Sequence, residues 1–333
     1  MPHAPSSSDS DVTPDAGVDA PVPDLSIIIV NWNARDLLRD CLDSIEANRG
    51  ALGLELIVVD NASTDGSAAM IAREFPSVHL IANGRNAGFA AANNQGLRAA
   101  RGRFLLLLNP DTVVLDDALT RALRRAEADP TIGILGCQAR TAPEVIQRTC
   151  FRFPSPLTTL LWVSGLSSRF PRAPLLGWAT YGPWDRRSER EVDVVSGMFM
   201  LVRREALEEV GLMDEAFFLY AEEADWCRRF RDAGRRCVLT PEACILHVHG
   251  GGNSTEQIGA HADVHKQQGT LQYHRKHRSF AAWLTTKMLF AVSSVLRTLW
   301  WSLWSALRIG RLSRAKAAQS ARAMRFHWLN AET

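Results

Sequence analysis

Three apolar segments of this chain each end in asparagine or aspartate. They are Leu25–Val30, Leu56–Val59 and Phe104–Leu108, and the residues that follow them read NWN, DNASTDG and NPD. Short apolar runs of this kind are typical of strands buried in a parallel sheet. The carboxyl ends of such strands meet at one edge of an open α/β sheet, where ligands bind. Because Asn and Asp also build turns and cap helices, each ending by itself has a local explanation.

The segments between these strands have helical periodicity. The spacing of apolar residues predicts helices over 34–48, 67–75 and 116–128, a helix of small residues ending at Ala100, and further strands over 78–81 and 133–136. Strands separated by helices of this length predict a mostly parallel sheet with right-handed crossovers. We therefore predict the α/β class, with a Rossmann-like sheet between flanking helices.

The turn after the first strand excludes two classes of nucleotide-binding enzyme. Dinucleotide-binding oxidoreductases carry GxGxxG at this position, and P-loop enzymes carry a Walker loop. This chain has NWNARD after its first strand and contains no Walker loop. Neither class fits the chain.

The cysteines and the lack of a secretory signal indicate the cellular compartment, and the composition of the N-terminal segment indicates disorder. The six cysteines form no CxxC pair, and nothing in the sequence resembles a secretory signal. We therefore predict reduced thiols in a cytoplasmic compartment. Residues 1–24 consist largely of Pro, Ser, Asp and Ala, which cannot bury enough apolar surface to order a chain, so we predict that they are disordered.

Seven segments, taken in order, carry a resemblance to a known family. They read IIIVNWN, VVDNASTDGS, NAGFAAANNQG, LLLLNPDT, VSGMFMLVRR, GLMDEAFFLYAEEADWCRR and HVHGGGNST. Over residues 25–255 the chain resembles the family 2 inverting glycosyltransferases, and within them the bacterial rhamnosyltransferase-like branch. The resemblance implies a glycosyltransferase A-type fold that binds a nucleotide-sugar and a divalent metal and transfers one sugar with inversion. It also implies a catalytic domain at 25–262, with a nucleotide-binding half at 25–140 and an acceptor half at 141–262.

The resemblance implies a set of residues that face the nucleotide-sugar. They are Asn31, Asn33, Asp60, Asn86, Gly88, Asn93 and Asp111. A pyrimidine base has an N3–H donor, and a carboxylate at a strand end, such as Asp60, is its natural acceptor. Local explanations stay open for Asn31, Asn33 and Asp60 as turn or capping residues. Gly88 can also serve a backbone turn alone.

A divalent metal, Mg²⁺ or Mn²⁺, is expected beside the nucleotide diphosphate. Asp111 aligns with the last acid of the family's metal motif, whose first acid is here Asn109, so one anionic ligand remains. A hard cation held by a carboxylate offsets the diphosphate charge and stabilises the leaving group. The resemblance places a histidine ligand ahead of the glycine run, and we favour His247 over His249. The alternative is that both are core or surface histidines.

The segment 213–229 is expected to carry the chemistry. An inverting transfer is a single displacement, so the acceptor hydroxyl needs a general base opposite the departing diphosphate. The resemblance places this base in the acidic pair Glu222–Glu223, and we predict Glu223, with Asp225 as the next candidate. The alternative is a helix N-terminus whose acids complement the helix dipole. Asp214 is expected to orient the acceptor or to cap the same helix.

The resemblance implies that the region around a predicted strand over 194–202 walls the donor-sugar and acceptor pocket. The resemblance places Ser196 and Gly197, within a predicted strand over 194–202, and the arginines Arg203 and Arg204 along its wall. Residues 141–190 are rich in Pro and Trp, a composition that predicts an irregular lid.

The C-terminal tail, 263–333, indicates an anionic partner surface. Residues 264–331 contain twelve Lys or Arg and no Asp or Glu, and Arg297 interrupts the apolar run. The runs are far shorter than the ~20 residues of a spanning helix. On a helix the segment presents a polar stripe opposite a Leu- and Trp-rich face, which predicts an amphipathic helical tail lying on an anionic membrane. Nucleic acid is not expected, because the aromatics cluster on the apolar face. Alternatively, this face packs on the catalytic domain or on a second subunit.

The function that we predict is a metal-dependent inverting glycosyltransferase. Its expected donor is a nucleotide-sugar, with dTDP-rhamnose favoured, and its expected acceptor a lipid-linked or cell-envelope glycan. The expected location is the inner face of the cell membrane. Two alternatives stay open: a transferase of another sugar to a polyprenyl phosphate, and a non-catalytic nucleotide-sugar-binding scaffold.

Overall fold

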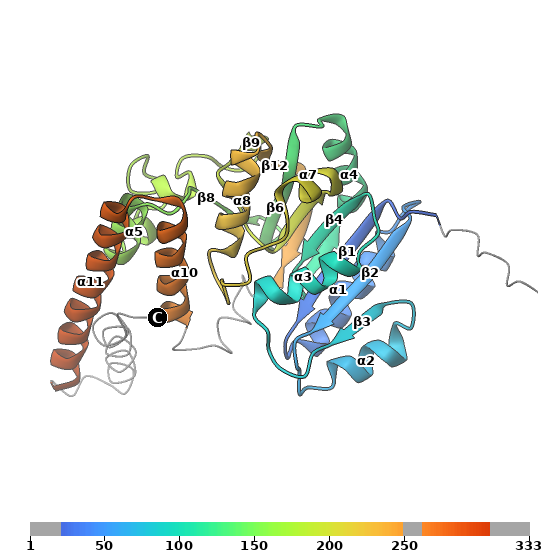
Figure 1. The fold of residues 1–333 in the computed structure, drawn as a ribbon, viewed down its shortest axis with the longest axis horizontal. Coiled ribbons are helices and arrows are strands. Elements are labelled where there is room, and N and C mark those ends of the chain that lie inside the picture. Colours follow the sequence, from blue (N-terminus) through green and yellow to red (C-terminus); the bar gives the residue numbers. More distant parts are fainter. Residues whose placement is uncertain (1–20, 249–261, 307–333) are drawn as a thin grey trace, which may run out of the picture.

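One mixed sheet organises the residues that the structure describes, 21–248 and 262–306 (Figure 1). In the computed structural model its strands are ordered β3-β2-β1-β4-β11-β6-β12-β5. Their bounds are β1 Leu25–Asn31, β2 Leu54–Asp60, β3 His79–Ala82, β4 Phe104–Leu108, β5 Thr112–Leu115, β6 Ile132–Ala142, β11 Phe199–Arg203 and β12 Arg236–His247. Four short strands lie at the periphery: β7 Val145–Ile146, β8 Cys150–Phe151, β9 Arg190–Glu191 and β10 Val194–Val195.

Strand direction explains why the site residues can meet. β1 to β4 form a parallel group, and β12 is parallel to β6. β11 is antiparallel to both β4 and β6, and β5 is antiparallel to β12. The two antiparallel steps across β11 restore the direction, so the carboxyl ends of β1, β2, β4, β6 and β12 share one edge. The strand expected over 194–202 is split into β10 and β11, because only its second part joins the main sheet.

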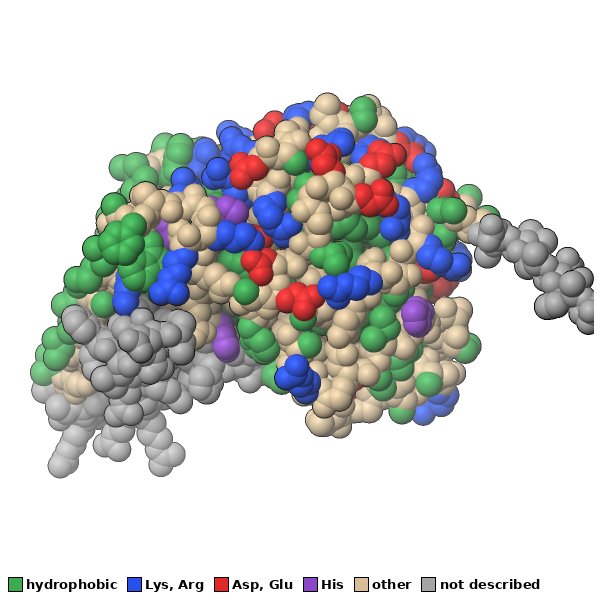
Figure 2. All heavy atoms as spheres, viewed as in Figure 1, with side chains coloured by type: hydrophobic (Ala, Val, Ile, Leu, Met, Phe, Trp, Pro, Cys, Tyr) green, Lys and Arg blue, Asp and Glu red, His purple; other side chains and the backbone are tan. Residues whose placement is uncertain are grey.

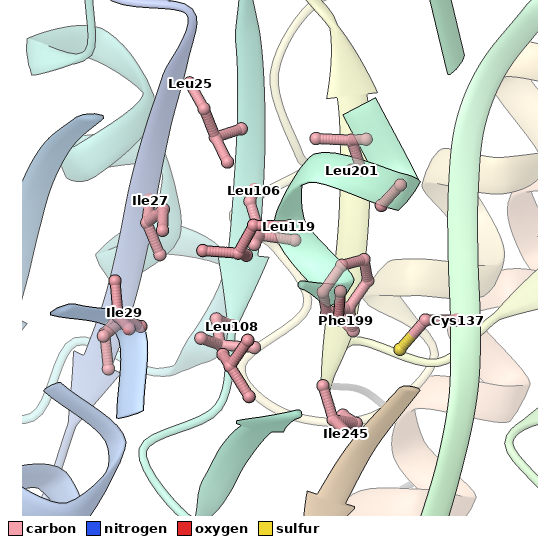
Figure 3. Packing of buried hydrophobic residues seen from close by; sticks show 14 of the residues in the cluster. Leu25, Ile27, Ile29, Leu106, Leu108, Leu119, Cys137, Phe199, Leu201 and Ile245 are labelled. Atoms are coloured by element: carbon pink, nitrogen blue, oxygen red, sulfur yellow. The ribbon is translucent and has the colours of Figure 1, made fainter. Parts of the chain in front are cut away.

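Helices cover both faces of the sheet, which confirms the predicted α/β class. Their bounds are α1 Arg35–Ala47, α2 Ser67–Glu74, α3 Phe89–Ala99, α4 Ala118–Ala128, α5 Pro156–Val163, α6 Leu166–Arg169, α7 Arg204–Val210, α8 Glu222–Asp232, α10 Ala262–His277 and α11 Phe280–Ala306. Successive residues of β1 alternate between the two faces. Ile27 and Ile29 pack with α1, α2 and α4 in the core of Figure 3, while Ile28 packs with α3, α7 and α8.

The last two helices pack beside the sheet domain. α10 contacts α8, and α11 contacts both α10 and α5, at the left of Figure 1. The segment expected to be an irregular lid contains α5 and α6, because the capping box of Ser155 and Thr158 with Pro156 starts a regular helix. No helix in the described ranges is long and apolar enough to span a membrane.

The outer face of α11 is apolar and exposed. Apart from the adjacent pair Leu299 and Trp300, its exposed large side chains recur every three or four residues. They are Phe280, Leu284, Met288, Val292, Leu296, Leu299, Trp300 and Leu303. They form one stripe, which Figure 2 shows as green side chains along the left margin, over α11. On the inner side of α11, Ser294 is buried, and Phe290 packs edge-on against Trp162 of α5, with ring centroids 5.7 Å apart. The expected continuation of the tail past residue 306 lies outside the described residues, as do residues 1–20.

Candidate active site

Asn31 and Asp60 lie side by side at the carboxyl edge of the sheet. They are opposite each other in the β1–β2 register, and Asn31 Nδ2 donates to Asp60 Oδ1 at 2.9 Å. The other carboxylate oxygen accepts the backbone N–H of Ser63 at 3.0 Å. Both side chains are buried. Asp60 thus forms the turn that local chemistry predicts, while a carboxylate, with about four lone-pair sites, can still accept another N–H.

A neighbouring asparagine, Asn61, holds the loop after β3 and was not among the predicted site residues. Asn61 Nδ2 donates to Asn86 Oδ1 at 2.8 Å, and Asn61 Oδ1 accepts the N–H of Ala87 at 2.9 Å. Asn86 Oδ1 also accepts the N–H of Gly88 at 2.9 Å. The loop that the resemblance assigns to the nucleotide-sugar is therefore fixed to the end of β2. Asn61 directly follows Asp60 in the sequence, and this position is the feature that could have identified it as a site residue.

Asn33 is hydrogen-bonded to the loop after β2, and Asn93 to the preceding turn of α3. Asn33 has a left-handed backbone, with φ +50°, and its Oδ1 accepts the N–H of Thr64 at 2.7 Å. Asn93 is buried on α3, and its Nδ2 donates to the carbonyl of Phe89 at 2.9 Å. The structure places both near the site edge with these bonds already formed.

The loop before α8 is held between two glycines. Gly88 has φ +86°, and a Cβ there would lie 2.5 Å from the carbonyl oxygen of Phe218. On the other side, a Cβ at Gly269 of α10 would lie 2.1 Å from the carbonyl oxygen of Tyr220. Tyr220 and Ala221 both have positive φ, at 69° and 72°. Neither glycine can be replaced without moving this loop, so α10 and the Gly88 turn together set where α8 begins.

Glu222 and Glu223 open α8, where Glu222 is buried and Glu223 is partly buried. Oε2 of each is inaccessible to solvent and has no hydrogen-bond partner among the described residues. Burial raises the pKa of Glu223, and burial together with the neighbouring Glu223 carboxyl raises the pKa of Glu222 well above its usual range. Carboxyl groups with raised pKa values are suited to proton transfer near neutral pH.

Asp225 has a different environment, because cations surround it. The side chain is fully buried, and Oδ2 accepts from Arg229 Nε at 2.9 Å. Oδ1 lies 2.8 Å from Lys276 Nζ and 2.7 Å from His277 Nε2 at the end of α10. Lys276 Nζ also lies 2.6 Å from Asp214 Oδ2. Asp225 of α8 and Asp214 of the loop before it therefore hold α10 against this part of the protein. The sequence pattern did not predict these contacts.

Asp111 and His247 converge at the end of β12. The antiparallel register of β5 with β12 sets Thr112 opposite His247, which brings Asp111 Oδ1 to 3.2 Å from His247 Nε2. Both side chains are buried, and neither atom has a hydrogen-bond partner among the described residues. His247 Nδ1 lies 2.9 Å from Gln147 Oε1. When Nδ1 of the neutral ring donates to that oxygen, Nε2 presents a lone pair toward Asp111.

This donor set fits a divalent cation. A carboxylate oxygen and an imidazole lone pair face each other in a buried place, and a cation would satisfy both. No cluster of three metal-ligating His, Cys, Asp or Glu side chains occurs within 21–248 and 262–306, so further ligands would come from the diphosphate or water. His249 lies outside the described residues. Gln147 was missed because no motif marks it.

Ser196 and Gly197 also lie at this edge. The backbone between β10 and β11 passes the NPD loop, where the N–H of Asn109 donates to the carbonyl of Met198 at 3.1 Å. A Cβ at Gly197 would lie 3.0 Å from the ring of Phe89, at the start of α3. These two residues therefore lie between the NPD loop and the Gly88 turn.

Arg203 and Arg204 correct one expectation. Because β11 is antiparallel to β4, Arg203 pairs with Phe104 at the start of β4. The guanidinium of Arg204 donates to the carbonyls of Gly102 and Ala100, at 2.7 and 2.8 Å. Both arginines thus lie at the opposite edge of the sheet and do not wall the pocket.

The model of the family described as glycosyl transferase family 2 matches residues 26–211. The chain belongs to glycosyl transferase family 2. This confirms the family that the seven segments predicted. A Mycobacterium tuberculosis N-acetylglucosaminyl-diphospho-decaprenol L-rhamnosyltransferase is 30% identical over 208 residues, which cover 58% of this chain and 66% of that relative. A Haloferax volcanii low-salt glycan biosynthesis hexosyltransferase is 27% identical over 215 residues, which cover 62% of each chain. The match thus spans just under two thirds of these relatives.

Two solved structures share the fold. A mannosyltransferase from Pyrobaculum calidifontis, in complex with GDP-Man and Mn²⁺, has a TM-score of 0.54 and 19% identity, covering 97% of this chain and 91% of that chain. A GalNAc-T7 structure with UDP, GalNAc and Mn²⁺ has a TM-score of 0.54 and 14% identity, covering 93% of this chain and 56% of that chain. The fold of this family 2 member is therefore of the glycosyltransferase A type that the resemblance implied.

Proposed function

We propose that this chain is a metal-dependent inverting glycosyltransferase that uses a nucleotide-sugar donor. The support for the proposal is that three unlike groups lie at or beside one edge of the sheet, since the Gly88 turn at this edge also packs against the loop before α8. Asp60 offers a carboxylate to a base, Asp111 and His247 offer two buried ligand atoms, and Glu223 offers a carboxyl with a raised pKa. A non-catalytic binding protein would not need the last of these.

Glu223 is the proposed general base. It accepts the proton of the acceptor hydroxyl as that oxygen attacks the anomeric carbon from the face opposite the nucleoside diphosphate. Asp225 is less suited, because its oxygens already accept from Arg229, Lys276 and His277. Glu222 is more deeply buried than Glu223, so the acceptor reaches Glu223 first.

Asp111 and His247 are the proposed protein ligands of Mg²⁺ or Mn²⁺. When bound, the metal would offset the charge that develops on the leaving diphosphate. Gln147 orients the His247 ring through Nδ1 and so keeps Nε2 directed toward Asp111. The mannosyltransferase of similar fold was solved with Mn²⁺, which supports a divalent metal in a protein of this fold.

The proposed donor is dTDP-rhamnose and the proposed acceptor a lipid-linked glycan. The support is the mycobacterial relative, whose name describes a rhamnosyltransferase acting on a sugar-diphospho-decaprenol. The exposed apolar stripe of α11 fits this acceptor, because apolar side chains beside Lys287 and Arg297 can enter an anionic leaflet. We therefore propose a peripheral position on the cytoplasmic face of the membrane. We also propose that the catalytic domain extends beyond residue 262 to the end of α10, because Lys276 and His277 contact Asp225.

The test is transfer of a labelled sugar by the purified full chain. We expect transfer from dTDP-rhamnose to a synthetic N-acetylglucosaminyl-diphospho-lipid with Mn²⁺ or Mg²⁺, and loss of transfer with EDTA. UDP-glucose and GDP-mannose serve as comparison donors. Transfer to polyprenyl phosphate alone would favour the second transferase alternative. Donor binding without turnover on any acceptor would indicate a nucleotide-sugar-binding scaffold.

A further inference from the structure

An arginine-lined cavity lies in the segment between β7 and β9. Its volume is about 520 Å³, and its wall includes Arg148, Arg172, Arg186 and Arg187 beside the two acids Glu144 and Asp185. None of these four arginines lies within ion-pair distance of a carboxylate in the described part of the chain. Many other arginines there do pair with a carboxylate, as Arg35, Arg103 and Arg236 show. The cavity therefore carries unpaired positive charge.

Arg186 shows that this charge is built into the structure. The residue is only 2% exposed, and its guanidinium donates to the carbonyls of Trp184 and Thr180. Its Nε has no hydrogen-bond partner among the described residues. Burial, with the nearby charge of Arg148, lowers the pKa of Arg186 to about 10. Burying a cation without an anion is unfavourable, and a bound anion would remove that cost.

Arg148 is the second anchored arginine of the cavity. Its Nη1 donates to the carbonyl of Gly182 at 3.2 Å and to that of Pro171. These carbonyl bonds orient the guanidinium without neutralising it. A planar guanidinium held in this way can form paired hydrogen bonds with phosphate oxygens.

The residues on either side of Arg148 in the sequence contact the candidate active site. Gln147, the residue before Arg148, contacts His247, and the carbonyl of Thr149 accepts the N–H of Ser196 at 3.1 Å. On the outer side, Val145 lines the cavity with its side chain 54% exposed. An occupant can therefore hold its charged part among the arginines, with apolar surface at the rim.

We propose that this cavity binds a diphosphate group. The inference rests on the proposed function, whose lipid-linked acceptor carries such a group. Phosphate oxygens are the anions that arginine clusters recognise best, and a cavity of this size admits a diphosphate. The source is either a lipid-linked diphosphate or free diphosphate. Both contain the diphosphate that the arginines would bind. They differ in that only the lipid-linked one carries a hydrocarbon chain.

The direct test is calorimetric binding to the full chain in EDTA, which prevents a metal–diphosphate complex at Asp111 and His247. The probes are inorganic pyrophosphate, geranyl diphosphate and geraniol. We expect both diphosphates to bind and geraniol not to bind. Tighter binding of geranyl diphosphate than of pyrophosphate would assign the cavity to a lipid-linked diphosphate, and equal binding would assign it to free diphosphate.

The double variant Arg172→Gln/Arg187→Gln locates the binding. Both side chains are exposed, so the fold should be retained. Arg124→Gln, an exposed arginine of α4, is the matched control. Since each charge-assisted hydrogen bond contributes about a tenfold factor or more, we expect the double variant to bind diphosphate at least about tenfold more weakly and the control to bind normally. Unchanged binding by the double variant, or no diphosphate binding by the wild type, would overturn the inference.

Kinetics separate this inference from the proposed function. The double variant should raise the KM for a diphosphate-linked acceptor and leave donor hydrolysis unchanged, because the donor lies at the sheet edge. If diphosphate binding fails but transfer is intact, the proposed function stands and the cavity assignment falls. If diphosphate binds at the arginines but no sugar is transferred, the proposed function falls.

Discussion

Asp111 Oδ1 and His247 Nε2 lie 3.2 Å apart, each buried and each without a hydrogen-bond partner among the described residues. When Nδ1 of the neutral ring donates to Gln147 Oε1, the two facing atoms are both acceptors. Two acceptors in such a buried place repel each other unless a cation or a proton lies between them. A bound cation would therefore stabilise this contact.

Asp111→Ala should abolish turnover and weaken metal-dependent binding of a nucleoside diphosphate. The reason is the loss of the one anionic ligand at this edge. The measurement is calorimetric titration of dTDP with and without Mn²⁺, alongside transfer assays. Asp43→Ala, an exposed acid of α1, serves as the control. Full activity in a folded Asp111→Ala protein would contradict the metal role.

Gln147→Leu should lower metal affinity while keeping both proposed ligands. Partners that orient a metal-bound histidine typically contribute about 10–100-fold in affinity. We expect a loss in this range, seen as a higher Mn²⁺ concentration for half-maximal activity, with kcat largely restored at saturating metal. A kcat that stays low at saturating metal would show that Gln147 acts on something other than the metal site.

Glu223→Gln should lower kcat by about 10²–10⁴ with donor affinity nearly unchanged, the range for losing a positioned general base.

Asp225→Asn should instead destabilise the fold by ~3 kcal/mol, because it breaks a buried ion cluster. Single-turnover kinetics and urea unfolding separate the two effects. A stable Asp225→Asn protein with the larger kcat loss would move the base from Glu223 to Asp225.

Glu222→Gln should stabilise the protein, and more so as pH rises. Burial and Glu223 raise the pKa of Glu222 in the folded state. The folded protein therefore holds this proton more tightly than the unfolded chain does, and stability is lost as pH rises from the ordinary carboxyl range through the raised value. We expect the Tm of the variant to exceed that of the wild type by roughly 3 °C or more at pH 8, and by less at pH 5. Glu208→Gln, on exposed surface, should show no such trend.

Leu299→Glu/Leu303→Glu should abolish binding to anionic vesicles without unfolding the chain. Both side chains are exposed, at 62% and 58%, so the acids meet water in the free protein and lipid in the bound one. Sedimentation with phosphatidylglycerol vesicles measures the effect, and salt should weaken wild-type binding. Val22→Glu, at another exposed apolar position, is the control. Vesicle binding equal to wild type would show that α11 does not meet the membrane.

The local pattern of the sequence predicted the strands, their polar ends and most helices. The apolar runs, the Asn and Asp endings and the helical spacing are properties of neighbouring residues, and they located Asn31, Asp60 and Asp111 at a strand edge before any contact was known. The family followed from the same segments, because their order reflects the order of the strands.

Only the tertiary structure decided which of these residues share a site. The register of β5 with β12 brought Asp111 to His247, and the direction of β11 moved Arg203 and Arg204 to the opposite edge. Asp225 contacts Lys276 and His277 of α10. These two residues lie some fifty positions further along the chain, so no local pattern could predict the contacts. Strand register, strand direction and buried ion pairs join residues distant in sequence, and their free energy comes from packing and desolvation that no local pattern records.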